Sequence, residues 1–337
     1  MRRELLRYLA CPSCGGELAA EGQEGISEIP IEDGTLRCET CATEFLVRGS
    51  IARFVTSTDR QSEVTRRTSR VYDFTWQYFG EREVRDDWEK DSYRYLSLIP
   101  QGLLSGGNKV GLEAGCGGGA DLLRVAAGGA TIVGFDLSAG VDVACQLVGE
   151  LDNVEVVQGD LHDLPFKPGV FDFIYSFGVL HHLPDTQGAF VRLASLLKPG
   201  APLITYMYED RSERQRLDHW LLSAVRVVRR VTSRLPPRVI HAACWALFPP
   251  VWLLCAAPAA VMRRLAPQTG AAMPFAHTLR PAVLVADLYD RFAPPVEWRF
   301  SKEQVRELYG RAGFERVECR QYRGWVSWGF KPSGTSA

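Results

Sequence analysis

The stretch that decides the fold is residues 110–121, which read V-G-L-E-A-G-C-G-G-G-A-D, followed by T-I-V-G-F-D-L-S with Asp136 near its end. The pattern predicts a buried strand, a glycine turn, a helix and a second strand. Gly115, Gly117 and Gly119 permit positive φ and leave the backbone bare where a ligand can approach it. A carboxylate at position 136 would accept hydrogen bonds from both hydroxyls of a ribose. The sequence therefore predicts an open parallel sheet that binds a ligand containing a nucleoside.

Glu113 distinguishes between two ligands that this turn allows. Gly115, Gly117 and Ala120 also satisfy the G-x-G-x-x-G/A pattern of dinucleotide-binding turns. A carboxylate two residues before the first glycine would repel a pyrophosphate, but it suits a cationic amino-acid group. S-adenosylmethionine carries such a group, so we expect it as the ligand and keep NAD as the alternative.

Three further strands are predicted in the same order along the chain. Residues 154–161 read as a third strand that ends in an acid, where Asp160 would bind the exocyclic amine of adenine and Leu161 would cover the ring. Residues 171–176 read as a fourth strand that ends at Ser176 and runs into F-G-V-L-H-H-L-P-D. Residues 203–208 form an apolar fifth strand after a helix that ends at K-P-G.

Together these motifs resemble the class I S-adenosylmethionine-dependent methyltransferases, most closely the branch that contains ubiquinone/menaquinone-biosynthesis and other small-molecule enzymes. The motifs E-x-G-C-G-x-G, G-F-D-L-S, G-D-L-x-x-L-P-F and F-D-x-I-x-S-x-x-V-L-H-H occur in order, and the resemblance covers about residues 109–208 and 280–330. It implies a Rossmann-like α/β sheet with helices on both faces. The cofactor site that it implies consists of Glu113, Gly115, Gly117, Gly119, Asp136, Leu137, Asp160, Leu161 and Ser176.

Two C-x-x-C pairs near the N-terminus, Cys11 with Cys14 and Cys38 with Cys41, are separated by 23 residues. Such pairs supply four thiolates for a tetrahedral Zn²⁺ site, so we predict a zinc ribbon over residues 1–56. The alternatives are a redox pair, which would not need a duplicate, and four unrelated thiols. So small a region buries little surface, and the metal would supply much of its folding energy.

The ribbon resembles the zinc-ribbon family of tRNA-methyltransferase activators. The shared motifs are L-A-C-P-x-C-x-G-x-L, L-x-C-x-x-C-x-x-E-F-x-V and G-S-I-A-R-F-V. Members of that family partner methyltransferases or are fused to them, which fits the order of the two regions in this chain.

The composition is that of a globular protein without long-range attraction for nucleic acid. The chain has 337 residues, 46% of them hydrophobic, and a net charge of −1. Residues 1–60 hold seven Arg and no Lys against ten Asp or Glu, whereas phosphate contacts need the opposite balance. We therefore expect the ribbon to be structural or to mediate an interaction. Charges spread through the first ten residues predict no secretory signal, so we expect a cytoplasmic protein with free or metal-bound thiols.

Residues 57–108 are predicted to form a linker and a helical lid that folds over the cofactor. Their aromatic part, V-Y-D-F-T-W-Q-Y-F-G, has Tyr72 and Trp76 at helical spacing. Most of these rings should pack on the core. Tyr72 and Trp76 are nevertheless kept as candidate substrate contacts, because in the small-molecule methyltransferases that the chain resembles the segment before the first strand often folds over the cofactor as a lid.

The least typical region is the insertion of residues 209–279. Its first half is basic and amphipathic, and residues 242–262 carry no charge for 21 positions. We expect Pro249, Pro250 and Pro258 to break this apolar stretch into short pieces, which disfavours a membrane span. The insertion would then form a lid over a hydrophobic substrate, a contact between two copies in a homodimer, or a peripheral membrane contact. Each of these suits a lipophilic acceptor.

The chain returns to the core in its last part. Residues 301–304, S-K-E-Q, have the form of a capping box that opens a helix ending near Gly313. Strands are predicted near residues 316–322 and 325–330, and residues 331–337 read as a frayed tail.

Methyl transfer requires little of the protein beyond holding the acceptor in line and excluding water, with a base where the acceptor is protonated. His181 and His182 follow the fourth strand and are the candidate bases, since histidine titrates near neutrality. Tyr206 is a weaker candidate for a substrate contact. The predicted function is methyl transfer to a small lipophilic molecule. The alternatives are an RNA or protein methyltransferase that docks through the ribbon, and a non-catalytic cofactor-binding partner that activates another enzyme.

Overall fold

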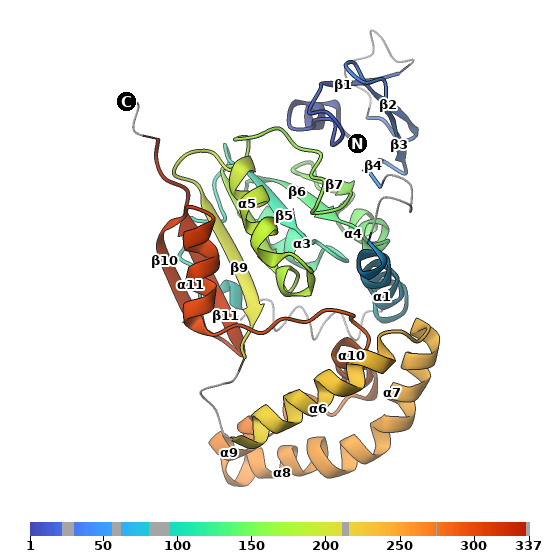
Figure 1. Cartoon of the computed structure of the whole chain (residues 1–337), viewed down its shortest axis with the longest axis vertical. Helices are drawn as coiled ribbons and strands as arrows, with labels where there is room; N and C mark the ends of the chain where they lie inside the picture. The colour runs from blue at the N-terminus through green and yellow to red at the C-terminus, as the bar shows by residue number, and fades with distance from the viewer. Residues whose placement is uncertain (22–29, 56–61, 81–94, 211–215, 274, 335–337) are drawn as a thin grey trace.

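The computed structural model describes residues 1–21, 30–55, 62–80, 95–210, 216–273 and 275–334. A four-cysteine β region lies at the top of Figure 1, an α/β sheet fills the centre, and a group of helices lies at the bottom. Parts of the predicted linker, the start of the insertion and the end of the tail fall outside the described residues.

The central sheet has the strand order β7-β6-β5-β8-β9-β11-β10. The first five of these strands are parallel, whereas β11 runs antiparallel to β9 and β10 antiparallel to β11. The strands are β5 (Val110–Ala114), β6 (Thr131–Asp136), β7 (Val154–Gln158), β8 (Phe173–Phe177), β9 (Pro202–Tyr208), β10 (Glu315–Gln321) and β11 (Gly324–Phe330). The strand order reverses beside β5, and ligands of open α/β sheets bind at such a switch point. The predicted α/β fold class is confirmed.

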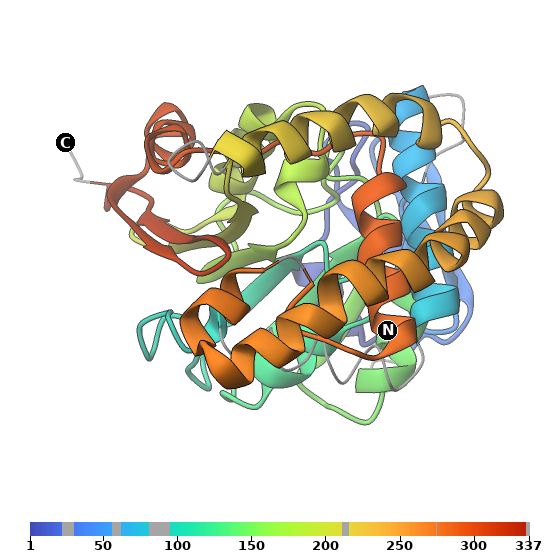
Figure 2. The same cartoon turned by 90° about the horizontal axis from the view of Figure 1, so that it is seen from below.

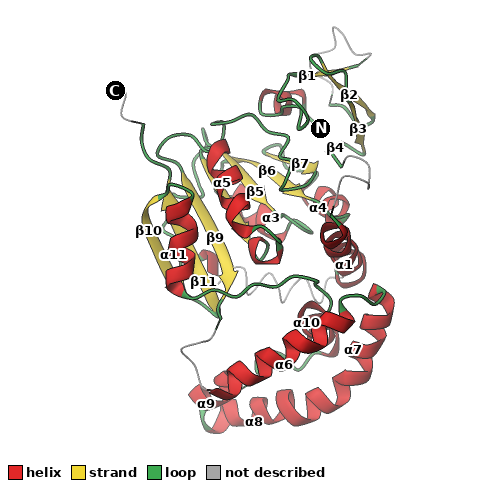
Figure 3. Ribbon diagram, viewed as in Figure 1, coloured by secondary structure: helices red, strands yellow, loops and turns green. Residues whose placement is uncertain are grey.

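Helices cover both faces of this sheet, as Figure 3 shows. One face carries α3 (Ala120–Ala126) and α4 (Gly140–Val148), with α1 (Glu63–Phe79) packed on α4, and the other carries α5 (Thr186–Leu196) and α11 (Lys302–Arg311). Alternate residues of each strand enter opposite cores: in β6, Ile132 packs with Leu122 of α3, whereas Val133 belongs to the core that contains Phe190 of α5. Burial on both faces explains why the strands read as nearly continuous apolar runs.

The four-cysteine region extends the same sheet to eleven strands. Its strands are β1 (Leu18–Ala20), β2 (Gly34–Cys38), β3 (Glu44–Arg48) and β4 (Ile51–Arg53). The last of these pairs in parallel with β7, where Ala52 lies opposite Val157. Leu36 and Phe45 share a hydrophobic core with Phe135 of β6. The region is therefore packed against the sheet edge and is more than a tethered module.

The helices after β9 form a separate layer. They are α6 (Arg216–Thr232), α7 (Pro237–Val251), α8 (Ala257–Leu265), α9 (Pro267–Ala272) and α10 (Pro281–Phe292). Ile240 and Cys244 of α7 pack with Leu288 of α10 and with Val71 of α1. This layer continues to Phe292, beyond the predicted end of the insertion, because the apolar side chains of α10 are buried against α1 and α7.

The prediction that prolines break the apolar stretch is wrong. Residues Pro237–Leu265 form one helix of 29 residues, in which α7 and α8 are joined by a π-helical turn, Trp252–Ala256. Pro249 and Pro250 lie inside α7 and are exposed, so the carbonyl groups that lose their N–H partners face solvent. The helix bends between α7 and α8 (Figure 1), as helices do at prolines and π-turns.

The C-terminal part agrees with the sequence analysis. Ser301 caps α11 through a complete capping box with Gln304, and β10 and β11 lie at the predicted positions. Together β10 and β11 complete the sheet next to β9.

Candidate functional site

A cavity of about 410 Å³ lies at the carboxyl ends of the central strands. Its walls come from α1, the glycine turn after β5, the ends of β6, β7 and β9, and α10. Most of the predicted site residues border it: Tyr72, Trp76, Glu113, Gly115, Gly117, Asp136, Leu137, Asp160, Leu161, His182 and Tyr206. The fold thus brings together residues that are more than 100 positions apart.

Three predicted residues do not border the cavity. Gly119 starts α3 with a φ of +84°. Ser176 is fully buried and donates its hydroxyl hydrogen to the carbonyl of Ala114 at 2.6 Å. His181 is also fully buried, and neither of its ring nitrogens has a hydrogen-bond partner among the described residues. Burial lowers the pKa of His181 well below its ordinary value, so the ring is neutral. All three lie outside the lining of the cavity and support the residues that form it.

The lid helix closes directly over the glycine turn. Gly117 has a φ of +50°, and a Cβ atom there would overlap the indole of Trp76. Cβ atoms at Gly118 and Gly140 would lie 2.9 and 2.6 Å from atoms of the same indole. The indole of Trp76 therefore packs directly on the backbone of these glycines, where any larger residue would clash with it. Helix α1, which carries Trp76, forms a wall of the cavity.

One end of the cavity is acidic. Glu113 is buried and accepts a hydrogen bond from the hydroxyl of Tyr175 at 3.0 Å. Burial, and then the neighbouring carboxylate of Asp121, raise the pKa of Glu113 well above its ordinary value. Asp121 also borders the cavity and accepts a hydrogen bond from Tyr95 at 2.6 Å. A ligand with an ammonium group would stabilise both carboxylates, whereas a pyrophosphate would be repelled.

The opposite wall suits a nucleoside. Asp136 accepts the backbone N–H of Gly117 at 2.9 Å through one oxygen, and the backbone N–H of Ser138 at 2.8 Å through the other. The oxygen that faces Ser138 also accepts the hydroxyl of that residue at 2.6 Å, so the acceptor position that remains for a ligand hydroxyl is on the oxygen that faces Gly117. Asp160 is fixed by the ring of His162 at 2.7 Å, and the pKa of Asp160 is lowered because hydrogen bonds and charge from His162 outweigh its burial. The residues therefore fit the adenosyl ligand predicted for them.

A second group of polar side chains lies against α10. Tyr208 donates its hydroxyl hydrogen to Asp290 at 3.2 Å. The hydroxyl of Tyr72 is buried and has no hydrogen-bond partner among the described residues. His182 places Nδ1 2.8 Å from the carbonyl oxygen of Val296. Because a carbonyl only accepts hydrogen bonds, Nδ1 carries the hydrogen, which leaves Nε2 as the ring nitrogen that can accept a proton.

Several of these groups were missed in the sequence. Asp287, Tyr289 and Asp290 all border the cavity from α10, a helix that the sequence analysis placed in the core. The available signal was the pair Asp287 and Asp290, three positions apart in an otherwise apolar helix, since that spacing puts both carboxylates on one face. Asp121 and Tyr95 give no comparable signal, because their pairing depends on the tertiary fold.

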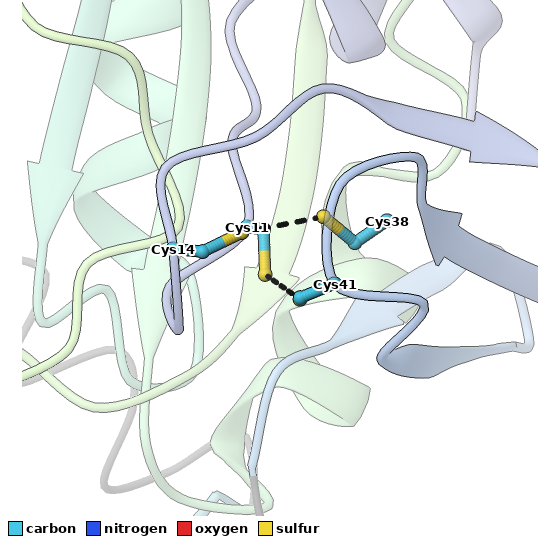
Figure 4. A group of neighbouring side chains, drawn as sticks. All are labelled: Cys11, Cys14, Cys38 and Cys41. Carbon is cyan, nitrogen blue, oxygen red and sulfur yellow. Dashed lines mark hydrogen bonds between the residues drawn. The ribbon is translucent and has the colours of Figure 1, made fainter.

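The four cysteines of the N-terminal region converge on one point, as Figure 4 shows. Their sulfur atoms all lie within 4.8 Å of one another. Cys11 and Cys41 place Sγ atoms 3.6 Å apart, and Cys14 and Cys38 place theirs 3.5 Å apart. A tetrahedral zinc ion with Zn–S bonds of about 2.3 Å separates its sulfurs by about 3.8 Å. The donor set therefore fits zinc.

Known proteins share the part of the chain that forms the glycine turn and the first five strands of the core. A family described as "Methyltransferase domain" matches residues 112–205. An uncharacterized protein of Synechococcus is 39% identical over 105 residues, which cover 29% of this chain and 25% of that protein.

Two curated methyltransferases match stretches of 111 and 126 residues. The fatty-acid O-methyltransferase of Mycolicibacterium smegmatis is 32% identical over 32% of this chain and 39% of that protein. The phthiotriol/phenolphthiotriol dimycocerosates methyltransferase of Mycobacterium leprae is 30% identical over 37% of this chain and 46% of that protein. The matches thus span less than half of the length of these relatives. Together with the fold, they identify residues 112–205 as a class I S-adenosylmethionine-dependent methyltransferase domain.

Proposed function

We propose that the chain uses this domain to transfer a methyl group from S-adenosylmethionine to a hydroxyl or carboxyl oxygen of a lipophilic acceptor. S-adenosylmethionine supplies, when bound, a methyl group already activated as a sulfonium. The observation that carries the proposal is the cavity itself. It joins the acidic glycine turn to a second set of buried polar groups from α1, β9 and α10.

The residues that line the cofactor half of the cavity would each contact a different part of S-adenosylmethionine. Glu113 and Asp121 would hold the ammonium group, and Asp136 would accept from the ribose hydroxyls. Asp160 and Leu161 would contact the adenine ring. Trp76 would cover the ligand from the lid and exclude water, which strengthens every electrostatic contact inside.

The acceptor half offers one base and, among the described residues, two buried hydroxyls without a hydrogen-bond partner, those of Tyr72 and Tyr289. Nε2 of His182 is free to take the proton of an acceptor oxygen, and the nearby Asp290 carboxylate would stabilise the imidazolium that forms. A buried hydroxyl without a partner costs about 1–3 kcal/mol, and a bound acceptor would remove that cost at Tyr72. Of the two histidines predicted as bases, only His182 borders the cavity, so we assign the role to it.

Two features support a lipophilic acceptor. Aromatic side chains surround the polar groups, with Tyr95 stacked on Tyr206 at 5.2 Å and Tyr72 edge-on to His182 at 5.7 Å between ring centroids. The two named relatives act, by their names, on a fatty acid and on phthiotriol dimycocerosates. The acidic balance of residues 1–60 argues against an RNA acceptor bound through the four-cysteine region.

The same proposal includes a zinc ion held by Cys11, Cys14, Cys38 and Cys41. Support comes from the convergence of four sulfurs and from the position of this region on the sheet edge. The ion would fix the two loops from which these cysteines project, which assigns it a structural role.

The decisive experiment measures transfer of labelled methyl groups from S-adenosylmethionine to a panel that contains a long-chain fatty acid, a phenolic lipid, transfer RNA and protein. We expect transfer to a lipophilic member, a kcat for His182→Gln lower by at least about a hundredfold, and a nearly unchanged kcat for His181→Leu. Transfer to transfer RNA or protein alone would replace the proposal with a macromolecular one. Binding of S-adenosylmethionine without transfer to any member would favour the non-catalytic partner, and binding of NAD alone would overturn the cofactor assignment.

A further inference from the structure

The helices after β9 expose an apolar surface that the fold does not cover. The helix Pro237–Leu265 is long and apolar enough to cross a membrane by length and composition, yet only 22% of its most apolar window is buried. Its inner face, with Ile240 and Cys244, packs on α10 and α1. Its outer face presents Leu253 at 65% and Leu254 at 72% exposure. A helix of a protein core would be mostly buried, so this face is built to contact something else.

The neighbouring helix α6 adds to the same surface. Val227 and Val231, one helical turn apart, are exposed and give α6 an apolar row of its own. In Figure 2 the orange helix of residues 237–265 crosses the side nearest the viewer, and the gold α6 runs along the upper edge of the same view. We call the outward faces of α6, α7 and α8 the apolar–basic surface.

Nearly all charged residues of this region are arginines. Residues 219–286 contain eight Arg and no Lys, Asp or Glu, so the remainder of the chain, with a total of −1, carries −9. Arg229 is buried in an ion pair with Glu297. Six further arginines are exposed and have no carboxylate partner among the described residues: Arg226, Arg230, Arg234, Arg238, Arg263 and Arg264. Arg238 and Arg264 bracket the apolar stripe of α7 and α8.

We propose that the apolar–basic surface docks on an anionic phospholipid bilayer, with the helices lying in the plane of the headgroups. Amphipathic helices with arginines beside the apolar face bind such interfaces, and anionic lipids attract each basic side chain near the surface. A second copy of the chain fits this face poorly, because it would bring two sets of unpaired arginines together. Since α10 backs α7 and lines the cavity with Asp290, docking would place the acceptor side of the cavity one helix away from the lipid.

The test is co-sedimentation of the full chain with vesicles, and it needs no methyl transfer. One set of vesicles is phosphatidylcholine alone, and the other contains about one third phosphatidylglycerol. We expect binding to the anionic set only, with an affinity that falls as salt rises from 50 to 300 mM. Leu254→Ser with Arg264→Gln should reduce binding by about tenfold or more. The matched control changes the same residue types in the four-cysteine region, Leu46→Ser with Arg48→Gln, and should bind like the parent.

Each other outcome overturns the proposal. Equal co-sedimentation of the protein with both vesicle sets, or with neither, would show that its exposed arginines do not direct it to anionic lipid. Binding that resists high salt and alkaline carbonate would mean insertion across the bilayer. A dimer in solution that Leu254→Ser with Arg264→Gln dissociates, without vesicle binding by the parent, would assign the surface to self-association. All four residues are exposed, so an unchanged melting temperature will show that the variants fold.

Discussion

Affinity for S-adenosylmethionine should rise with pH through the titration of Glu113. In the free protein, burial raises the pKa of this carboxyl well above its ordinary value, so it holds a proton at pH values where an exposed glutamate would have lost it. The ammonium group of the ligand pairs with the carboxylate form. Binding therefore releases a proton, and the dissociation constant falls by up to tenfold for each pH unit until the pKa of the free protein is passed. The same shift means that the unligated protein loses stability as pH rises through this window.

Tyr175 allows the size of the effect to be worked out. Its hydroxyl donates to Glu113 at 3.0 Å, which stabilises the carboxylate. A hydrogen bond to a charged group contributes about 1.5–3 kcal/mol, and one pKa unit corresponds to about 1.4 kcal/mol. In Tyr175→Phe, the pH at which the affinity for S-adenosylmethionine rises should therefore be about one to two units higher than in the parent protein. Glu113→Gln should abolish the rise and weaken binding at pH 7 by about ten- to a hundredfold.

Isothermal titration calorimetry from pH 5 to pH 7 measures both effects, because the amino group of the ligand stays protonated in that range. Buffers of different ionisation enthalpy report the released proton directly. The reasoning fails if the parent protein shows a flat affinity over this range, or if Glu113→Gln keeps the slope of the parent. Burial also raises the pKa of Asp136, so this residue can contribute to the pH dependence of the affinity. The variant Glu113→Gln separates the contribution of Asp136 from that of Glu113.

Three further predictions concern other parts of the molecule. Gly117→Ala should weaken cofactor binding by at least about tenfold, because its Cβ overlaps Trp76 and its φ is positive, and calorimetry that shows parental affinity would contradict the lid assignment. Elemental analysis should find one zinc per chain, and Cys38→Ser should lower both the zinc content and the melting temperature; a metal-free protein with intact thiols and parental stability would refute the zinc site. Arg229→Met should lower the free energy of unfolding in urea by about 2–3 kcal/mol, because the buried carboxylate of Glu297 then loses one of its two arginine partners. Adding Glu297→Gln should restore some of that loss, and a larger loss in the double variant would contradict this explanation.

The fold and the cofactor half of the site could be predicted because their signals are local. A strand, a glycine turn and a carboxylate such as Asp136 follow one another within 30 residues, and each has a pattern of its own. The capping box at Ser301 likewise depends on four neighbouring residues. The spacing of the cysteines indicated a compact cluster for the same reason, and their sulfur atoms do converge.

The acceptor half could not be predicted because it depends on where separate elements meet. Asp290 contacts Tyr208 only because α10 packs against α1 and α7 rather than on the sheet. The prolines were misjudged for a related reason. Their effect depends on whether the carbonyl groups that they deprive of a partner are buried or, as at Pro249 and Pro250, exposed to water.

The apolar–basic surface and the proposed base are joined by one buried ion-pair network. Arg229, on α6, donates to Glu297 at 2.7 Å, and Glu297 also accepts from Arg299 at 2.8 Å. The residue before Glu297 is Val296, whose carbonyl oxygen fixes the ring of His182. A shift of α6 on a bilayer would therefore act on the segment whose carbonyl group holds the ring of His182. If docking and catalysis are coupled in this way, anionic vesicles should raise kcat in the parent and leave it unchanged in Arg229→Met, with acceptor supplied in soluble form to both.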